Sequence, residues 1–363
     1  MNILPLAVDI SVIWNKTWPI LMAILFFGLI IGLHELGHFL SAKLFGVKVN
    51  EFALGMGPAI FKKTKGETKY ALRLLPIGGY VSMEGEDASS DDERAFCNKK
   101  WWKKFIIVAA GAIMNLILGF IFIVILTSMD DLIGTTQIHS FYENATSAQY
   151  GLEAGDIIKE INGTNIYSNR DIGYALQRDE DGIYDFVVER NGEKTELKDV
   201  HFETQPAENG HNVIIYDFII VGVEKTPLNV LSTSVLDTVS TARLVWLTLF
   251  DLITGRYGIN DLSGPVGTVS IIADVTTEAV ATGTGFDMII YIMALISINI
   301  GVFNLLPIPA LDGGRLFFIM IEAIFRKPIP AKYEGLIHGI GLSMLMIFMV
   351  FITLNDIKNL IVN

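Results

Sequence analysis

The sequence predicts a polytopic α-helical membrane protein with four transmembrane helices, a β-hairpin in its first loop and one inserted extracytoplasmic α+β domain. Hydrophobic residues make up 51% of the 363 residues, and the mean hydropathy of +0.47 is too high for a wholly soluble protein of this size. Four stretches are long and apolar enough to cross about 30 Å of hydrocarbon as helices. The hairpin and the domain lie in the polar segments between them.

The four predicted spans are nearly free of charge. They are Trp18 to Ala42, Phe105 to Met129, Met288 to Leu306 and Leu336 to Leu354. A cleaved signal peptide is the alternative for the first span. That span is longer than the usual apolar core of a signal peptide, lacks a basic region before it and runs directly into a His/Glu cluster. We therefore expect it to be retained.

A fifth apolar stretch, Leu244 to Ile253, is too short to span a membrane, and Arg243 and Asp251 interrupt it. Hydrophobic residues recur at helical spacing through Leu231 to Thr254. This pattern predicts an amphipathic helix at the membrane surface, followed by a linker that ends near residue 285.

The distribution of charge predicts the orientation. Lys43 to Lys104 carries twelve Lys and Arg residues, so the positive-inside rule places this loop in the cytoplasm. Asp130 to Pro227 has seven basic and nineteen acidic residues and is expected outside, as are both chain ends. The net charge of −12 argues against nucleic acid as a partner. The single cysteine, Cys97, excludes an intramolecular disulfide and a cysteine-rich zinc site.

The residues that point most directly to chemistry end the first span. His34-Glu-Leu-Gly-His38 follows an uncharged run, and residues four apart share a helix face, so two imidazoles can bind one metal ion, with zinc the expected metal. Glu35 lies beside them and can take a proton from a water whose pKa zinc lowers to roughly 7. Ionisable groups in a membrane helix cost roughly 2.5 to 3.5 kcal/mol each, and a bound cation compensates them.

A catalytic zinc ion usually has three protein ligands, so the third must come from elsewhere in the chain. The third span ends in the motif Asn304 to Arg315, and the expected topology brings Asp312 to the depth of the two histidines. The prolines and glycines of this motif cannot continue a regular helix, and irregular backbone at membrane depth is tolerated where it lines a cavity. Asp312 is the predicted third ligand; its alternative role is to cap a turn beside Arg315.

Three other polar residues lie in the spans. Asn115 and Asn304 need partners in hydrocarbon, and either can hold a substrate carbonyl or bridge two helices. His338 is a rival metal ligand by residue type. Its place in a regular helix favours a hydrogen-bonded packing role instead.

The polar segments have their own patterns. Glu51 to Met83 contains two apolar runs around a polar turn at Lys62 to Lys69, which predicts a hairpin that can offer a strand edge to an extended substrate; a plain connecting loop is the alternative. Asp130 to Pro227 is expected to be a β-rich domain with a helix over Ser168 to Arg178 and a hairpin turn at Asn191-Gly192. Nothing in that domain looks catalytic.

Five motifs, in order over nearly the full length, resemble those of the site-2 protease family of intramembrane zinc metalloproteases, in particular its bacterial regulator-of-sigma-E type. They are His34 to His38, the Gly55 to Tyr80 hairpin, Gly111 to Asn115, Leu262 to Gly267 and Asn304 to Arg315. Residues 150–163 are similar to part of a PDZ domain. The family often has Gly-Pro where this chain has Gly111-Ala112, some relatives carry two PDZ domains, and the usual carboxylate-binding loop of a PDZ domain is not evident.

The resemblance implies one zinc ion held by His34, His38 and Asp312, with Glu35 as general base. It implies a hairpin that re-enters the membrane and a PDZ-like domain that acts as a size filter. Its substrate-contacting residues would be Gly78, Gly79, Tyr80, Asn115 and Asn304. The substrates would be single-span proteins of a bacterial cell membrane, such as anti-sigma factors or remnant signal peptides. An upstream site-1 protease would cut them first, without forming a stable complex.

Two other functions are compatible with parts of this pattern. A membrane scaffold would use the PDZ-like domain to bind partners and would keep only a structural or lost metal site. A transporter is less compatible, because four spans without an inverted repeat are visible. An open metal position beside Glu35 distinguishes the protease from the scaffold, since a structural site is closed by a fourth protein ligand.

Overall fold

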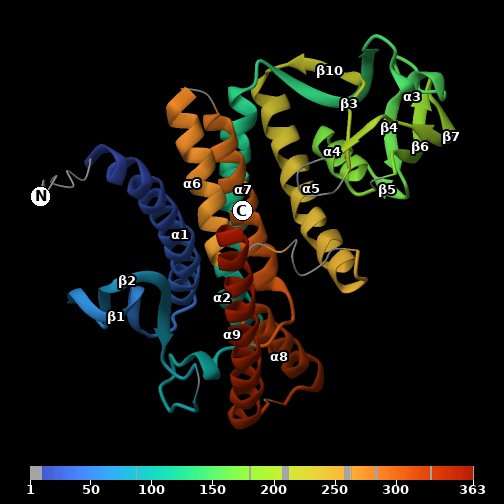
Figure 1. The fold of residues 1–363 in the computed structure, drawn as a ribbon. Coiled ribbons are helices and arrows are strands. Elements are labelled where there is room, and N and C mark those ends of the chain that lie inside the picture. The colour runs from blue at the N-terminus through green and yellow to red at the C-terminus, as the bar shows by residue number, and fades with distance from the viewer. Residues whose placement is uncertain are drawn as a thin grey trace, which may run out of the picture. The chain divides into compact units, whose positions relative to one another are not determined.

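The computed structural model describes residues 10–86, 88–179, 181–206, 212–256, 262, 264–282, 285–327 and 329–362. Ser263 of the Leu262 to Gly267 motif and both chain ends lie outside these ranges. The chain forms two compact units, residues 1–122 with 249–363 and residues 123–248 (Figure 1). The first unit holds the candidate metal site, and the second holds the larger β-sheet.

Within the described residues, four helices are long and apolar enough to cross a membrane, as expected from the sequence. They are α1 (Ile10–Leu44), α2 (Trp101–Met129), α7 (Phe286–Leu305) and α9 (Ala331–Val362). In the most apolar window of each helix, 50% of the residues of α2 are buried but only 6% of those of α9. Because α2 is enclosed by other elements, it can contribute to a buried site, whereas the exposed apolar side chains of α9 need lipid around them.

Three further helices are α5 (Pro227–Ile253), α6 (Pro265–Thr282) and α8 (Asp312–Phe325). Helix α5 matches the amphipathic helix expected at 231–254. The sequence analysis missed α6, which occupies the expected linker. The Asp356 carboxylate of α9 accepts hydrogen bonds from the backbone N–H groups of Gly264 and Gly267 at 3.1 and 2.8 Å. The cap that begins α6 therefore comes from a distant part of the chain.

A short non-helical segment, residues 306–311, separates α7 from α8. The expected break in the helix is confirmed, but it is shorter than expected, because Gly313 and Gly314 lie in the first turn of α8 rather than in irregular backbone. A Cβ atom on Gly313 would overlap the backbone of Leu306, and one on Gly314 would overlap the carbonyl of Ile308. The glycines are needed because the start of α8 packs closely against the backbone of residues 305–309, and this packing holds Asp312 at the start of α8.

The expected hairpin consists of β1 (Val49–Lys65) and β2 (Thr68–Met83). Its pairing is more complex than the predicted simple hairpin. Residues 51–54 pair with 69–72 on one side and with 79–82 on the other, while residues 59–65 pair with 68–73. Both strands therefore bend, at glycines with positive φ such as Gly55 and Gly78, and form a small sheet of four segments. Residues 79–83 lie at one edge of this sheet.

The second unit is an antiparallel sheet of strand order β10-β3-β4-β6-β7, with β5 paired to β4. The strands are β3 (Leu132–Phe141), β4 (Ile157–Ile161), β5 (Thr164–Asn165), β6 (Ile183–Arg190), β7 (Glu193–His201) and β10 (Phe218–Glu224), and a separate ribbon pairs β8 (Thr204–Pro206) with β9 (Asn212–Ile214). The predicted helix is α4 (Asn169–Gln177), begun by a capping box at Ser168, and the short α3 covers Thr146–Gln149. The turn at Asn191-Gly192 joins β6 to β7 as predicted.

Buried ion pairs join α4 to α5 within the second unit. Arg170 Nε lies 2.9 Å from Asp237 Oδ2, and Arg243 Nη2 lies 3.0 Å from Asp171 Oδ1. Both carboxylates are almost fully buried. The first part of α5 is therefore fastened to the sheet domain, because breaking a buried ion pair leaves an uncompensated charge.

Candidate metal centre and active site

The two histidines of the first span face the same way from adjacent turns of α1. Their Nε2 atoms lie 3.2 Å apart. The helix runs without a break from Ile10 to Leu44, so the four-residue spacing alone places the imidazoles side by side. His38 is buried and His34 is half-buried.

Asp312 reaches the same point from the start of α8. Its Oδ2 atom lies 3.1 Å from His34 Nε2 and 3.1 Å from His38 Nε2. Among the described residues, these three side chains form a group whose ligand atoms all lie within 4.8 Å of one another. The fold thus brings together the three residues that the sequence analysis selected as metal ligands.

Helix α2 orients both imidazoles. His38 Nδ1 lies 2.9 Å from the carbonyl oxygen of Ile107, so Nδ1 carries the proton and Nε2 keeps its lone pair. His34 Nδ1 lies 3.3 Å from the side-chain amide of the fully buried Asn115. If this amide is turned so that Oδ1 faces His34, the oxygen accepts the Nδ1 proton and gains the partner that it otherwise lacks. Asn115 therefore bridges α2 to a ligand candidate.

The geometry fits a metal ion. Two imidazole nitrogens and one carboxylate oxygen meet within 3.2 Å, and Asp312 Oδ2 is buried without a hydrogen-bond donor in the described part of the chain. Acceptors this close repel one another unless a cation lies between them. Ligands of a tetrahedral zinc ion lie about 3.3 Å apart, and two nitrogens with one oxygen are a ligand set of catalytic zinc that leaves a fourth position open.

Two glycines allow α1 and α2 to approach closely. A Cβ atom on Gly37 would overlap the carbonyl of Ala110, and one on Gly111 would overlap both imidazoles. Small residues at these positions let the two helix backbones come together. Ala112, which stands at the position of the usual proline, is fully buried.

Glu35 lies beside the ligand candidates and against the hairpin. It lines a cavity of about 170 Å³ together with those three residues and Tyr80. A Cβ atom on Gly79 would be 2.9 Å from Glu35 Cγ, so only glycine fits there without moving the carboxylate. Strand β2 therefore forms one wall of the cavity that contains the candidate general base.

The other predicted substrate contacts differ in their positions. Tyr80 lines the cavity, and its hydroxyl is hydrogen-bonded to Arg73. Gly78 has a φ of +80° and packs against Met56 within the hairpin. Asn304 is half-buried in the last turns of α7 and is not among the residues that line the cavity.

Charged side chains fasten the hairpin. Burial alone would raise the pKa of Glu51, but hydrogen bonds from Lys69 and Arg73 lower it to about 2. Burial and the charge of Glu51 raise the pKa of Tyr80, so the phenol stays protonated at neutral pH. Glu51 is thus a charged link between β1 and β2 and does not exchange protons near neutral pH.

The sequence analysis missed several residues of this site. Glu86 and Arg315 line the cavity and form an ion pair, but no local pattern marks Glu86, because its partner lies far along the chain. Ile107 contributes only a backbone carbonyl, which residue type does not reveal. His338, the rival ligand, accepts a hydrogen bond from the Ala310 N–H at 2.9 Å, as expected of a packing histidine.

Comparison with known proteins places this geometry in a family. The sequence profile of peptidase family M50 matches residues 22–348. The chain belongs to peptidase family M50. It is 36% identical over 338 residues to a protein of Clostridium acetobutylicum that bears a zinc metalloprotease name, covering 93% of this chain and 97% of that one. It is 30% identical over 423 residues to the regulator of sigma-W protease RasP of Bacillus subtilis, covering 93% and 97%.

Membership in this family makes the chain a zinc metalloprotease of the site-2 type, and the His-His-Asp group is its candidate zinc site. The resemblance read from the five motifs is therefore confirmed. With four candidate spans, the chain is a membrane protein that acts on proteins.

Proposed function

We propose that this M50 protease is an intramembrane endopeptidase that cuts the transmembrane segments of single-span membrane proteins. The observation that carries the proposal is the place of the metal group. His34 and His38 belong to the candidate span 17–44, with His38 six residues, or about 9 Å, from its end. A peptide bond that reaches this group lies at the depth of a lipid bilayer rather than in bulk water.

In this proposal His34, His38 and Asp312 hold the zinc ion and Glu35 is the general base. Zinc held there would polarise the scissile carbonyl and make the attacking water more acidic. Glu35 takes the proton from the water and delivers it to the leaving amine. Asn115 keeps the His34 ring in the orientation that this chemistry needs.

The hairpin is the proposed substrate-binding element. An edge strand presents unpaired N–H and C=O groups, and proteolysis needs an extended substrate backbone that can pair with them. Residues 79–83 form an edge of the hairpin sheet, and Gly79 lies against Glu35. We place the substrate backbone along Gly78, Gly79 and Tyr80, with Asn304 as a further contact.

The surface of the hairpin supports its re-entry into the membrane. Six of its large apolar side chains are 49% to 64% exposed. They are Met56, Ile60, Phe61, Leu72, Leu74 and Leu75. So many exposed apolar side chains are unusual on a loop in water, and insertion beside the membrane helices would bury them.

We further propose that the protein lies in a bacterial cell membrane with the metal site near the cytoplasmic face and residues 130–227 outside. That assignment rests on the twelve basic residues between Lys43 and Lys104. The outer part would be a PDZ-like size filter that admits substrates already shortened by a site-1 protease. Anti-sigma factors suit this scheme, since a relative is named regulator of sigma-W protease, and remnant signal peptides suit it as well.

The test is cleavage of a shortened single-span model substrate by the detergent-purified protein. Wild type is compared with Glu35→Gln, and wild type is also treated with a zinc chelator. We expect Glu35→Gln to bind zinc in the wild-type amount and to lose at least about 10²-fold in turnover, because a general base contributes 10² to 10⁴. Chelation should stop cleavage, and added zinc should restore it.

Two results would contradict the proposal. Turnover retained in Glu35→Gln would exclude its role as general base. Stoichiometric zinc in a wild-type protein that cuts none of several shortened single-span substrates, but cuts a soluble extended peptide, would exclude transmembrane segments as its substrates.

A further inference from the structure

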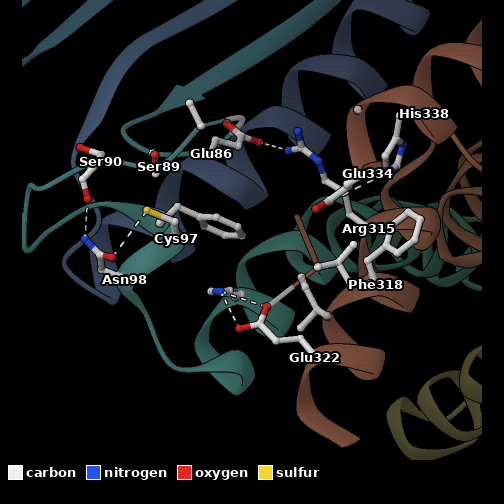
Figure 2. A pocket seen from close by; sticks show the side chains of 17 residues that line it. Glu86, Ser89, Ser90, Cys97, Asn98, Arg315, Phe318, Glu322, Glu334 and His338 are labelled. Atoms are coloured by element: carbon white, nitrogen blue, oxygen red, sulfur yellow. Dashed lines mark hydrogen bonds and ion pairs between the residues drawn. The ribbon is translucent and has the colours of Figure 1, made fainter. Parts of the chain in front are cut away.

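A second, larger cavity adjoins the metal site. It measures about 400 Å³ and lies between the loop that follows the hairpin and helices α8 and α9 (Figure 2). We name it the loop cavity and name the 170 Å³ space beside Glu35 the metal-site cavity. Polar side chains line much of the loop cavity, including Ser89, Ser90, Asn98, Glu322 and Glu334. This lining suits water better than it suits lipid or an apolar transmembrane segment.

Glu86 and Arg315 line both cavities. Figure 2 shows the two side chains pointing toward one another, joined as an ion pair. Glu86 also accepts a hydrogen bond from the backbone N–H of Met83 at 3.2 Å, which fixes it at the end of β2. Arg315 lies one turn after Asp312 in α8. The pair thus joins the hairpin to the helix that carries a ligand candidate, at the boundary between the two cavities.

The chemistry of the site requires such a boundary to open. Each peptide bond that is cut consumes one water molecule, yet the ligand candidates are buried or half-buried. The wall that β2 provides is part of a hairpin with exposed apolar side chains, which repel water. The side of the metal-site cavity that faces the loop cavity is closed by charged groups that water can solvate when they separate.

We propose that the Glu86–Arg315 ion pair closes the route by which water and small hydrophilic solutes reach the metal site from the loop cavity. This inference rests on the zinc site of the proposed function, but it does not depend on which substrate is cut. When the pair is formed, the two cavities are separate. When it opens, they join into one aqueous path to Glu35 and the three ligand candidates.

The direct test is the rate at which a hydrophilic chelator removes zinc from the purified full-length protein. Glu86→Gln removes the charge of the pair, and we expect zinc release to become at least about tenfold faster, corresponding to a barrier lowered by about 1.4 kcal/mol. Glu86 is the better position to change, because Arg315 also lines a third cavity beside Asp312. The charge-reversed double variant Glu86→Arg with Arg315→Glu should return the rate toward the wild-type value.

The matched control is Glu322→Gln. Glu322 pairs with Lys104 Nζ at 3.0 Å and lines the loop cavity, but it does not line the metal-site cavity. Its release rate should stay within about twofold of wild type, because this pair lines the loop cavity only and its loss leaves the Glu86–Arg315 pair in place. If Glu322→Gln releases zinc as fast as Glu86→Gln does, the proposal is overturned. A general loosening of the protein around the cavities would then explain both rates.

Equilibrium zinc affinity separates a closure from a loss of ligand geometry. Opening a route speeds binding and release equally, so the dissociation constant of Glu86→Gln should equal that of wild type. If Glu86→Gln releases zinc faster only because its affinity falls by the same factor, the pair positions Asp312 and does not close a route. A wild-type release rate in Glu86→Gln would also overturn the proposal.

Labelling of Cys97 tests whether zinc leaves through the loop cavity. It lines the loop cavity and is the single cysteine of the chain. A bulky hydrophilic thiol reagent attached to Cys97 should slow zinc release several-fold in Glu86→Gln and have no effect in Glu86→Gln combined with Cys97→Ser. Release that is unchanged in the labelled protein would show that zinc leaves by another route. These readouts need no substrate, so they stand whether or not transmembrane segments are cleaved.

Discussion

Gly111 of α2 lies against both imidazoles of the candidate metal centre. Its missing side chain leaves the space in which the rings of His34 and His38 lie, and a Cβ atom there would overlap both. The rings also depend on Ile107 and Asn115 for their orientation. The centre is therefore set by one helix that supplies imidazoles and a second that supplies space and hydrogen-bond partners.

We expect Gly111→Ala to lower zinc affinity at least about tenfold, within the range found when residues that support a metal ligand are changed. Competition with a chromophoric chelator measures this affinity. Gly28→Ala in α1 is the control, because a Cβ atom at residue 28 meets nothing within 4 Å. It should keep wild-type affinity. Equal zinc affinity in Gly111→Ala and Gly28→Ala would contradict this prediction. It would show that the two imidazoles can accommodate a methyl group at residue 111.

Among the elements, the hairpin shows how charge can hold a strand against a site. Its sheet folds back so that residues 79–83 reach Glu35, and the fold depends on Glu51 linking β1 to Lys69 and Arg73 of β2. Lys69 lies in the segment that pairs with residues 51–54, and Arg73 directly follows this segment. Loss of the Glu51 charge would release the first segment from its neighbour and loosen the edge that we assign to the substrate.

This link predicts a pH dependence. The pKa of Glu51 falls from its usual 4.5 to about 2 in the folded protein. A lowered carboxyl pKa contributes stability that is complete above the unfolded pKa and is lost as the pH falls through the folded one. The difference in unfolding temperature between wild type and Glu51→Gln should be constant from pH 7 to about 4.5 and narrow below that. A difference that stays the same down to pH 3 would contradict the assignment.

As a whole molecule, the protein is a membrane protease whose sheet domain is inserted in the chain between α2 and α5. The chain enters this domain through β3 and leaves through β10, and these strands pair with each other, Ile133 opposite Val223 and Leu132 opposite Glu224. Paired strands lie about 5 Å apart. The two chain ends left by removing the domain can therefore be rejoined by a short linker. Because α5 then loses its α4 partners Arg170 and Asp171, the shortened protein also carries Asp237→Asn and Arg243→Gln.

Replacing residues 134–222 by a short Gly-Ser linker tests the size filter. We expect the shortened protease to cut a single-span substrate that retains its outer domain at least about tenfold faster than wild type does, because a steric barrier to the site is gone. A substrate that lacks its outer domain should be cut at similar rates by both proteins, and this comparison controls for folding. If the shortened protease still does not cut the substrate that retains its outer domain, the sheet domain does not select substrates by size.

The sequence alone determined the four spans, the His34-Glu-x-x-His38 pair, the existence of the hairpin and the helix α4. These depend on signals within a few residues: apolar run length, four-residue spacing, turn glycines and the Ser168 cap. The sequence also singled out Asp312, because the predicted directions of the spans limit which polar residues reach the same membrane depth as His34 and His38. The motifs of the chain together pointed to the family that the comparisons establish.

Only the tertiary structure decided the rest. Helix α6 begins at a cap supplied by Asp356, the hairpin bends into four segments, and Asn115 turns toward His34. The Glu86–Arg315 pair at the cavity boundary joins residues 229 positions apart. None of these leaves a local pattern, since each arises where elements distant in sequence pack together and satisfy one another's buried polar groups.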